Sequence, residues 1–346
     1  MELMNGLQTL TNSTIGLFVL LPIGISLLIY GADKLVDDTA EIAQRLGTSE
    51  FIIGLTVIAF GTSIPEFFVG IQSINYGAEN VAMGTIIGSN IANIGLIFGF
   101  AAIGKSIYKR NPFMKKISNQ KAFLVRKRQY LALLLSTFFL GISLMDLEIK
   151  PYEGALILSL LAGFMTAIWF DKGIDVSVLE DTDINDERSA PRIVMSLIFA
   201  FILLFLGSQL TLDSATGLAS NFGISQAIIG LIVVAVGTSL PELAATISAI
   251  KKNKLSLIVG NVIGSNVFNI ILVVPVLAFF GKARMDPNLF KEDFVVMSMM
   301  TVLFAAFLWL YSLRDSFNKT TQFIINISSY SFIFFYFLYI IFRVFF

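Results

Sequence analysis

Two glutamates, each placed inside an apolar stretch, are the residues of this chain best suited to bind a metal ion. Glu66 ends the segment GTSIPE at 61–66, and Glu242 ends the segment GTSLPE at 237–242. Ionisable side chains at membrane depth are energetically costly and usually serve a function. A carboxylate held by Ser or Thr only for packing is the alternative interpretation, but the same costly group in two copies of one motif favours a shared task. We therefore predict that the two carboxylates bind a cation together.

The composition limits which cation this can be. The chain has no Cys and no His, which excludes thiolate and imidazole metal sites, disulfides and catalysis by either side chain. The ligands that remain are oxygens. Ca²⁺ takes about six to eight oxygens in flexible geometry, whereas Mg²⁺ requires a tight octahedron and loses water reluctantly. Two carboxylates also neutralise one divalent ion, so we expect Ca²⁺, with Na⁺ in smaller subsites. Competition of both ions for the same glutamates would enforce exchange.

A proline precedes each glutamate and predicts a break in the helix that carries it. Pro65 and Pro241 have no N–H to donate, and their rings push the preceding turn apart. We expect freed carbonyls at 59–62 and 235–238. At membrane depth such groups are tolerated only where they are buried in protein or line a cavity, so the breaks favour a binding site over a simple kink.

The next apolar stretch of each half supplies further oxygen ligands. It reads GTIIGSNIAN at 84–93 and GNVIGSNVFN at 260–269. The Ser and the last Asn of each segment are four residues apart and share one helix face, and the two glycines of each G-x-x-x-G allow close helix packing. The predicted oxygen ligands are Glu66, Glu242, the hydroxyls of Thr62, Ser63, Thr238, Ser239, Ser89 and Ser265, the amides of Asn93 and Asn269, and carbonyls near Ala59 and Ala235.

These segments belong to an internal repeat. Residues 52–98 align without gaps with 228–274, at a constant offset of 176, with 21 identities in 47 positions. The identities include Gly, Thr, Ser, Pro, Glu and Asn, which chance similarity between apolar helices does not produce. Five predicted spans separate equivalent segments, so the second copy crosses the membrane in the opposite sense. Inverted repeats of this kind are typical of secondary transporters.

The composition places these spans in a bilayer. The 346 residues are 56% hydrophobic and 14% charged, with a mean hydropathy of +0.81, which is too apolar for a soluble domain. A span needs about 20 apolar residues. Ten stretches qualify, at 15–32, 51–75, 81–104, 129–147, 152–170, 192–212, 224–250, 256–280, 293–313 and 321–344. We predict an all-α integral membrane protein of ten transmembrane helices in two inverted five-helix repeats, at 1–170 and 191–346, joined by an acidic cytoplasmic linker at 171–190.

The charges predict an orientation. Lys and Arg number 24, as do Asp and Glu, so net charge does not suggest a nucleic acid partner. With the N-terminus outside, 19 of the 24 basic residues fall on the inner side and five on the outer side, as the positive-inside rule requires. Nine of them lie in 105–128, where they set topology and could also contact anionic lipid. We expect both termini outside, and the plasma membrane of a prokaryote as the location. Asp33, Asp146, Glu148, Asp213 and Arg343 fall near span ends, where interfacial solvation accounts for them.

The paired motifs identify a family resemblance. GTSIPE with GSNIANIGLI, and GTSLPE with GSNVFNIILV, resemble the two α-repeats of the sodium/calcium exchanger branch of the calcium/cation antiporter superfamily, over the whole ten-helix layout. The resemblance implies that the first and sixth helices slide against the rest during alternating access. By the same resemblance the following ligand sets are implied: Glu66, Glu242 and the carbonyls of Thr62 and Thr238 for Ca²⁺; Ser63, Ser89 and the Ala59 carbonyl for one Na⁺; Ser239, Ser265 and the Ala235 carbonyl for its mirror; Asn93 and Asn269 at the centre.

One residue departs from the family pattern. Many sodium-exchanging members carry Asp where this chain has Asn269, so the central site has one carboxyl fewer. This argues against a K⁺-dependent mode and leaves proton coupling open. The motifs do not resemble the proton/calcium branch, so we expect Na⁺ as the counter-ion.

Three other functions compete with Ca²⁺/Na⁺ exchange. A Ca²⁺/H⁺ antiporter would use the same scaffold with protonated glutamates. The inverted repeat with broken helices argues against a passive cation channel, which would use a repeated filter loop. An intramembrane enzyme would need a nucleophile paired with a base, which the sequence does not offer. No Walker A motif is present, and we expect no cofactor and no obligate protein partner.

Overall fold

The computed structural model describes residues 13–103, 127–170, 188–223, 235–252, 254–281, 285–313 and 328–345. Within these ranges the chain is helical and contains no β-strand. The helices, with π-helical segments marked η, are α2 (Thr14–Arg45), α3 (Glu50–Ile53), η1 (Gly54–Ile58), α4 (Ala59–Thr62), α5 (Ile64–Asn75), α6 (Glu79–Ala92), η2 (Asn93–Phe98), α8 (Lys127–Ser143), α9 (Pro151–Phe170), α10 (Ala190–Asn221), α12 (Ala235–Thr238), α13 (Leu240–Lys251), α14 (Leu255–Phe268), η6 (Asn269–Val273), α15 (Val274–Phe280), η7 (Leu289–Phe294), α16 (Val295–Ser312) and α18 (Ser331–Phe345).

The all-α prediction is confirmed, and each of the ten predicted spans contains a helix in the described part of the chain. Six helical segments there are long and apolar enough to cross a membrane, at Thr14–Arg45, Glu50–Asn75, Glu79–Ile103, Ala190–Asn221, Ser256–Phe280 and Leu289–Ser312. Shorter apolar helices cover Gln129–Ser143, Pro151–Thr166 and Ser331–Arg343. The basic segment 105–126 and the linker residues 171–187 lie outside the described ranges, as does the first part of the seventh span.

Two helices exceed their predicted lengths. α2 and α10 have 32 residues each, or about 48 Å of helix. Hydropathy ends the first span at residue 32, before Asp33, but α2 continues to Arg45 because its polar residues find partners. Asp38, for example, is buried and its Oδ1 accepts a 2.7 Å bond from Nη1 of Arg188.

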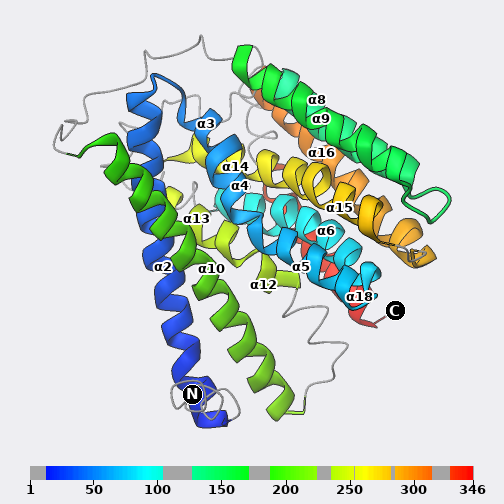
Figure 1. Cartoon of the computed structure of the whole chain (residues 1–346), viewed down its shortest axis with the longest axis horizontal. Coiled ribbons are helices and arrows are strands. Elements are labelled where there is room, and N and C mark those ends of the chain that lie inside the picture. Colours follow the sequence, from blue (N-terminus) through cyan, green and yellow to red (C-terminus); the bar gives the residue numbers. More distant parts are fainter. Residues whose placement is uncertain are drawn as a thin grey trace.

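α2 and α10 lie side by side and are inclined steeply to the other helices, beyond which their far ends project (Figure 1). Glycines form the seam between them. A Cβ on Gly24 would come 2.8 Å from the Thr211 nitrogen, and one on Gly207 would come 2.7 Å from the Leu28 nitrogen. The two backbones are therefore in direct contact, which any larger residue would prevent.

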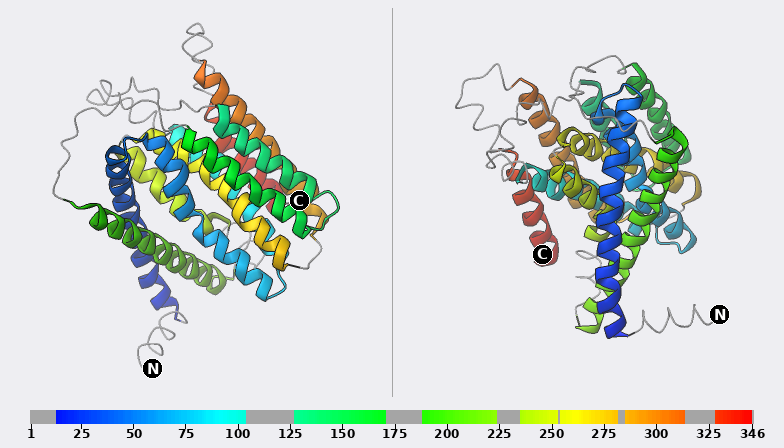
Figure 2. Two further views of the ribbon diagram at one scale, coloured as in Figure 1. Left: turned by 45° about the horizontal axis from the view of Figure 1, so that its top comes forward. Right: turned by 90° about the vertical axis from the view of Figure 1, so that its left-hand side faces the viewer.

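The remaining helices form the bundle that holds the motifs shared by the two halves of the repeat. α14 packs against α3, η1 and α4. α8 packs against α14, α9 packs along α15, and α16 packs against α8 and α6 (Figures 1 and 2). The two most buried spans are Glu79–Ile103 and Ser256–Phe280, which are equivalent in the repeat. The segments carrying Ser89, Asn93, Ser265 and Asn269 therefore lie at the centre of the bundle.

Arg343 has a more specific role than the interfacial solvation expected for it. Its Nη1 donates to Glu292 at 2.8 Å, and its Nε lies 3.0 Å from Asp293. The Tyr339 hydroxyl donates to the same Asp293 at 2.7 Å. These contacts attach α18 to η7.

Candidate metal centre

The predicted helix breaks are present at both GTS-x-PE motifs. α4 ends at Thr62, Ser63 has φ −83° and ψ 1°, and α5 begins at Ile64. Ser239 (φ −90°, ψ 10°) separates α12 from α13 in the same way. Each break follows from the proline two residues later, which fits the first turn of a new helix because its missing N–H needs no partner there.

The break does not release every carbonyl that the sequence suggested. The Ala59 carbonyl still accepts the Ser63 N–H at 3.1 Å, and the Thr62 hydroxyl lies 3.4 Å from it. Pro65 instead deprives the Gly61 carbonyl, four residues earlier, of its helical donor. Ala235 begins α12.

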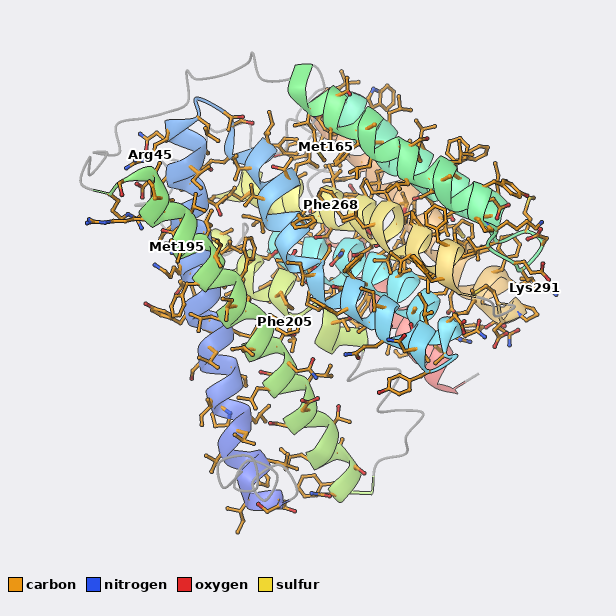
Figure 3. All side chains as sticks on the ribbon, viewed as in Figure 1. Arg45, Met165, Met195, Phe205, Phe268 and Lys291 are labelled. Atoms are coloured by element: carbon orange, nitrogen blue, oxygen red, sulfur yellow. The ribbon has the colours of Figure 1, made fainter. Side chains whose placement is uncertain are left out.

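α10 covers both breaks. A Cβ on Gly61 would come 1.8 Å from the ring of Phe201, and one on Gly237 would come 2.4 Å from Leu212. Ser208, between these two on α10, donates to the Gly237 carbonyl at 3.2 Å. One turn before Ser208, α10 carries Phe205 (labelled in Figure 3), whose ring centroid lies 5.9 Å from that of Phe68 on α5. The glycine of each motif thus makes room for α10.

The glycines of the second G-x-x-x-G allow the close packing that we predicted. A Cβ on Gly260 would come 2.3 Å from the Phe51 carbonyl, and one on Gly264 would come 2.3 Å from the Leu55 carbonyl. The equivalent Gly84 and Gly88 meet no backbone atom within 4 Å among the described residues. The prediction is therefore confirmed for the second half only.

The predicted polar side chains lie together in the interior of the protein. Each break packs against the glycine-rich helix of the opposite half, α4 on α14 and α12 on α6. None of the predicted ligand side chains is more than 3% exposed; they are Thr62, Ser63, Glu66, Ser89, Asn93, Thr238, Ser239, Glu242, Ser265 and Asn269.

Two hydroxyl pairs join the halves in a crossed arrangement. Thr62 Oγ1 lies 3.2 Å from Ser265 Oγ, and Thr238 Oγ1 lies 3.2 Å from Ser89 Oγ. Adding 176 to Thr62 and subtracting it from Ser265 gives the second pair. The inverted repeat of the sequence is thus expressed as a local two-fold relationship at the site.

The two glutamates differ in their hydrogen bonds. Glu66 Oε1 accepts the Ser89 hydroxyl at 3.1 Å, whereas its Oε2 and both oxygens of Glu242 accept no hydrogen bond from a described residue. No Lys or Arg of the described ranges forms an ion pair with either carboxylate. Burying two carboxylates without a basic partner is costly, so this arrangement calls for cations.

The two central asparagines mark a local change of helix type. The π-helical segments η2 and η6 begin at Asn93 and Asn269, which are equivalent in the repeat. π-Segments inside α-helices occur frequently at functional sites. Asn269 donates to Asn90 Oδ1 at 3.1 Å, while both polar atoms of the Asn93 side chain have no described partner.

Three further asparagines contribute to the site and were not predicted. Asn90 donates to the Asn266 carbonyl at 3.2 Å, and Asn261 accepts from Thr62 at 3.3 Å. Asn90 and Asn266 are identical in the two G-S-N segments, a signal that could have identified them. Asn261 has no such signal, because its equivalent in the first half is Thr85.

The unpartnered oxygens of the repeat motifs fit a hard cation. Eight buried side-chain oxygens of these motifs accept no hydrogen bond and donate none in the described structure: Ser63 Oγ, Glu66 Oε2, Asn93 Oδ1, Ser239 Oγ, Glu242 Oε1 and Oε2, Asn266 Oδ1 and Asn269 Oδ1. Buried oxygens without partners are unfavourable unless something binds them. The described residues contain no cluster of three or more His, Cys, Asp or Glu side chains, so neutral oxygens must complete the coordination around the two carboxylates.

Comparison with known proteins identifies the family of the chain. Residues 16–170 and 193–345 match the model of the family described as sodium/calcium exchanger protein. The chain is 32% identical over 302 residues to the inner membrane protein YrbG of Escherichia coli, covering 84% of this chain and 88% of YrbG. It is 35% identical to the putative antiporter CaxA of Alkalimonas amylolytica, covering 83% and 87%. It is 30% identical to the sodium/calcium exchanger MaX1 of Methanosarcina acetivorans, covering 84% and 92%.

Solved structures of the sodium-calcium exchanger NCX_Mj share the fold. The form soaked with 100 mM Na⁺ and 10 mM Sr²⁺ superposes with a TM-score of 0.74 at 27% identity, covering 94% of this chain and 98% of that one. The form soaked with 2.5 mM Na⁺ and 0.1 mM Ca²⁺ gives a TM-score of 0.72 at 28% identity, covering 94% and 96%. The ten-helix prediction is thereby confirmed, and with it the membrane location and a transport function rather than an enzymatic one. The chain belongs to the sodium/calcium exchanger branch of the calcium/cation antiporter superfamily.

Proposed function

We propose that this antiporter exchanges Ca²⁺ for Na⁺ by alternating access, with Glu66 and Glu242 as the shared carboxylates. The observation that carries the proposal is the buried pair itself: within the part of the chain that the structure describes, three of its four carboxylate oxygens have no hydrogen-bond partner and no Lys or Arg pairs with either glutamate. Two carboxylates balance one divalent ion, and the surrounding hydroxyl and amide oxygens extend the coordination toward the number that Ca²⁺ prefers.

The other ligands divide between the two ions. The carbonyls of Thr62 and Thr238 would complete the Ca²⁺ site. Na⁺ would bind Ser63, Ser89 and the Ala59 carbonyl in one half, and Ser239, Ser265 and the Ala235 carbonyl in the other. The free hydroxyls of Ser63 and Ser239 support this division. Ala59 would join only when the Thr62 hydroxyl turns away from its carbonyl. Asn93 and Asn269 would lie between the ions, where the family's usual third carboxyl is absent.

Relatives support exchange but do not select the counter-ion. MaX1 is named a sodium/calcium exchanger and CaxA a putative antiporter, and NCX_Mj was studied with Na⁺, Ca²⁺ and Sr²⁺. Sodium is proposed for this chain because the neutral hydroxyl and carbonyl groups beside each glutamate form subsites of a size and chemistry that a proton does not need.

The test is ⁴⁵Ca²⁺ uptake into proteoliposomes of the purified full chain. Vesicles loaded with Na⁺ and diluted into Na⁺-free buffer should accumulate Ca²⁺, whereas vesicles with equal Na⁺ on both sides should not. Loading with K⁺, or a pH jump alone, should give no uptake above protein-free vesicles. Uptake driven by the pH jump and indifferent to Na⁺ would instead establish a Ca²⁺/H⁺ antiporter, and uptake without any gradient would indicate a channel.

We also propose that both termini lie outside the membrane, in a chain of two inverted halves, 1–170 and 191–346. The asymmetric distribution of Lys and Arg supports this orientation. Since the chain has no cysteine, single cysteines at Leu46 and Glu148 can be labelled in intact cells with an impermeant maleimide. Only the cysteine at 148 should react; the opposite pattern would reverse the topology.

A further inference from the structure

The two glycine-rich helices differ at one position that reaches the site in only one half. Asn261 of α14 corresponds to Thr85 of α6 under the repeat offset. Thr85 is partly exposed, and its hydroxyl donates to the Val81 carbonyl of its own helix at 2.9 Å. Asn261 is 2% exposed and points into the cluster of hydroxyls around the breaks. The repeat is therefore asymmetric at the site.

Asn261 contacts the hydroxyls of Thr62 and Ser265. We call these two residues with Glu242 the Glu242 half-site, and Thr238, Ser89 and Glu66 the Glu66 half-site. The Oδ1 of Asn261 lies 3.3 Å from Thr62 Oγ1 and 3.3 Å from Ser265 Oγ, so it is an acceptor within reach of either hydroxyl. For the related pair, Thr238 and Ser89, no described asparagine provides an equivalent acceptor. There the Ser89 proton goes to Glu66 Oε1 at 3.1 Å.

The direction in which these hydroxyls donate decides which oxygen lone pairs each half-site has available to coordinate an ion. A hydroxyl has one proton and two lone pairs, so a hydroxyl that donates to Asn261 turns its lone pairs away from that bond. In the Glu242 half-site, a neutral amide oxygen lies within reach of both hydroxyls, and both Glu242 oxygens have no hydrogen-bond partner among the described residues. In the Glu66 half-site, a cation must displace the hydrogen bond from Ser89 before Glu66 Oε1 can coordinate it.

We propose that Asn261 is a positioning residue for ion binding, which holds the Thr62 and Ser265 protons away from Glu242. The Glu242 half-site is thereby prepared to accept the cation first, and the Glu66 half-site closes around it second. This inference rests on the proposed function, because it assumes that the ion binds between the two glutamates.

Three variants separate positioning from packing. Asn261→Leu keeps the size of the side chain but removes the acceptor, and Asn261→Thr introduces the residue of the first half. Asn261→Asp keeps an acceptor in the same place. The matched control is Thr85→Val, which removes a hydroxyl at the equivalent position away from the site.

The expected result is a change in apparent affinity for Ca²⁺ with little change in maximal rate. In Na⁺-loaded proteoliposomes, Asn261→Leu and Asn261→Thr should raise the KM for Ca²⁺ about fivefold to tenfold, the loss expected for one or two hydrogen bonds. Asn261→Asp should restore the wild-type KM or lower it, and Thr85→Val should leave it unchanged. The same order should appear in the Ca²⁺ concentration needed to raise the melting temperature of the purified protein.

A double-mutant cycle tests the partner. Asn261→Leu should cost little further affinity when Ser265→Ala is already present, but its full effect should persist beside Ser89→Ala. Equal effects in both backgrounds, or an unchanged KM in Asn261→Leu, would overturn the positioning role while exchange by the wild type still stood. If the wild type neither exchanges nor binds Ca²⁺, the proposed function itself fails.

Discussion

Asn90 donates a 3.2 Å hydrogen bond from its side chain to the backbone carbonyl of Asn266, the residue 176 positions later that is its own counterpart in the repeat. Two equivalent residues can meet only near the axis that relates the halves. The crossed pairs of Thr62 with Ser265 and Thr238 with Ser89 lie around the same axis. The ion site is therefore built where the two copies of the repeat touch.

Removing either carboxylate should stop Ca²⁺ transport. Glu66→Gln and Glu242→Gln each leave one negative charge for a divalent ion in a buried pocket, and we expect ⁴⁵Ca²⁺ uptake to fall at least about 100-fold, as for a broken buried charge pair. Glu148→Gln, in the exposed turn after α8, is the control and should transport normally. Normal uptake by either pocket variant would remove the site assignment.

Asn269→Asp should change the pH dependence of exchange. The substitution adds a third carboxyl to the pocket and removes the donor that now bonds Asn90 Oδ1 at 3.1 Å. Uptake should become more sensitive to acid than in the wild type, because a third acidic group can take up a proton in competition with the ions. The measurement is the rate of Na⁺-driven Ca²⁺ uptake between pH 5 and pH 9, values chosen to span about two units on each side of neutrality. An identical profile for both proteins would show that this position does not contact the ions.

Lys252 should strengthen the packing of α2 against α13. Its Nζ lies 2.7 Å from Asp37 and donates to the Asp33 carbonyl at 2.6 Å. Lys252→Met should loosen this contact and increase the maleimide labelling rate of a single cysteine at the buried Ala249 by about threefold to tenfold. Lys150→Met breaks an ion pair far from α2 and serves as control. Equal labelling in both backgrounds would show that Lys252 does not hold the two helices together.

Arg343→Met should destabilise the protein more than the loss of a surface ion pair. Asp293 is buried, and the variant leaves its charge with Tyr339 as its remaining strong partner. We expect a loss of about 1–3 kcal/mol, whereas Lys150→Met, whose pair with Asp146 is exposed, should cost less than about 1 kcal/mol. Thermal unfolding in detergent gives the comparison. Adding Asp293→Asn to Arg343→Met should recover part of the loss; no recovery would assign it to packing instead.

Much of the fold could be predicted because two strong signals agree. Apolar stretches of spanning length located the ten helices, and the repeat showed which of them are equivalent. The lengths of α2 and α10 were underestimated, since hydropathy stops before Asp33 although partners such as Arg188 allow the helix to continue. Such partners lie about 150 residues away in the chain and leave no local signal.

The candidate site was predicted by residue type, but not its asymmetry. Glu66 and Glu242 occupy equivalent positions of the repeat, yet among the described residues a hydroxyl donates to Glu66 and none to Glu242. The difference arises from Asn261, which the repeat comparison passes over because it is one of the mismatched positions. π-Helical segments at Asn93 and Asn269 also escaped prediction, because a single extra residue per turn does not alter hydropathy.

The glycine seam between α2 and α10 has a consequence for coupling efficiency. Because the backbones touch at Gly24 and Gly207, we expect α2 and α10 to move together as one rigid pair. This helix pair contacts both helix breaks, through Phe201 at Gly61 and Leu212 at Gly237. An ion leak would require one half of the protein to change conformation without the other. Close packing of α2 against α10 opposes such independent movement.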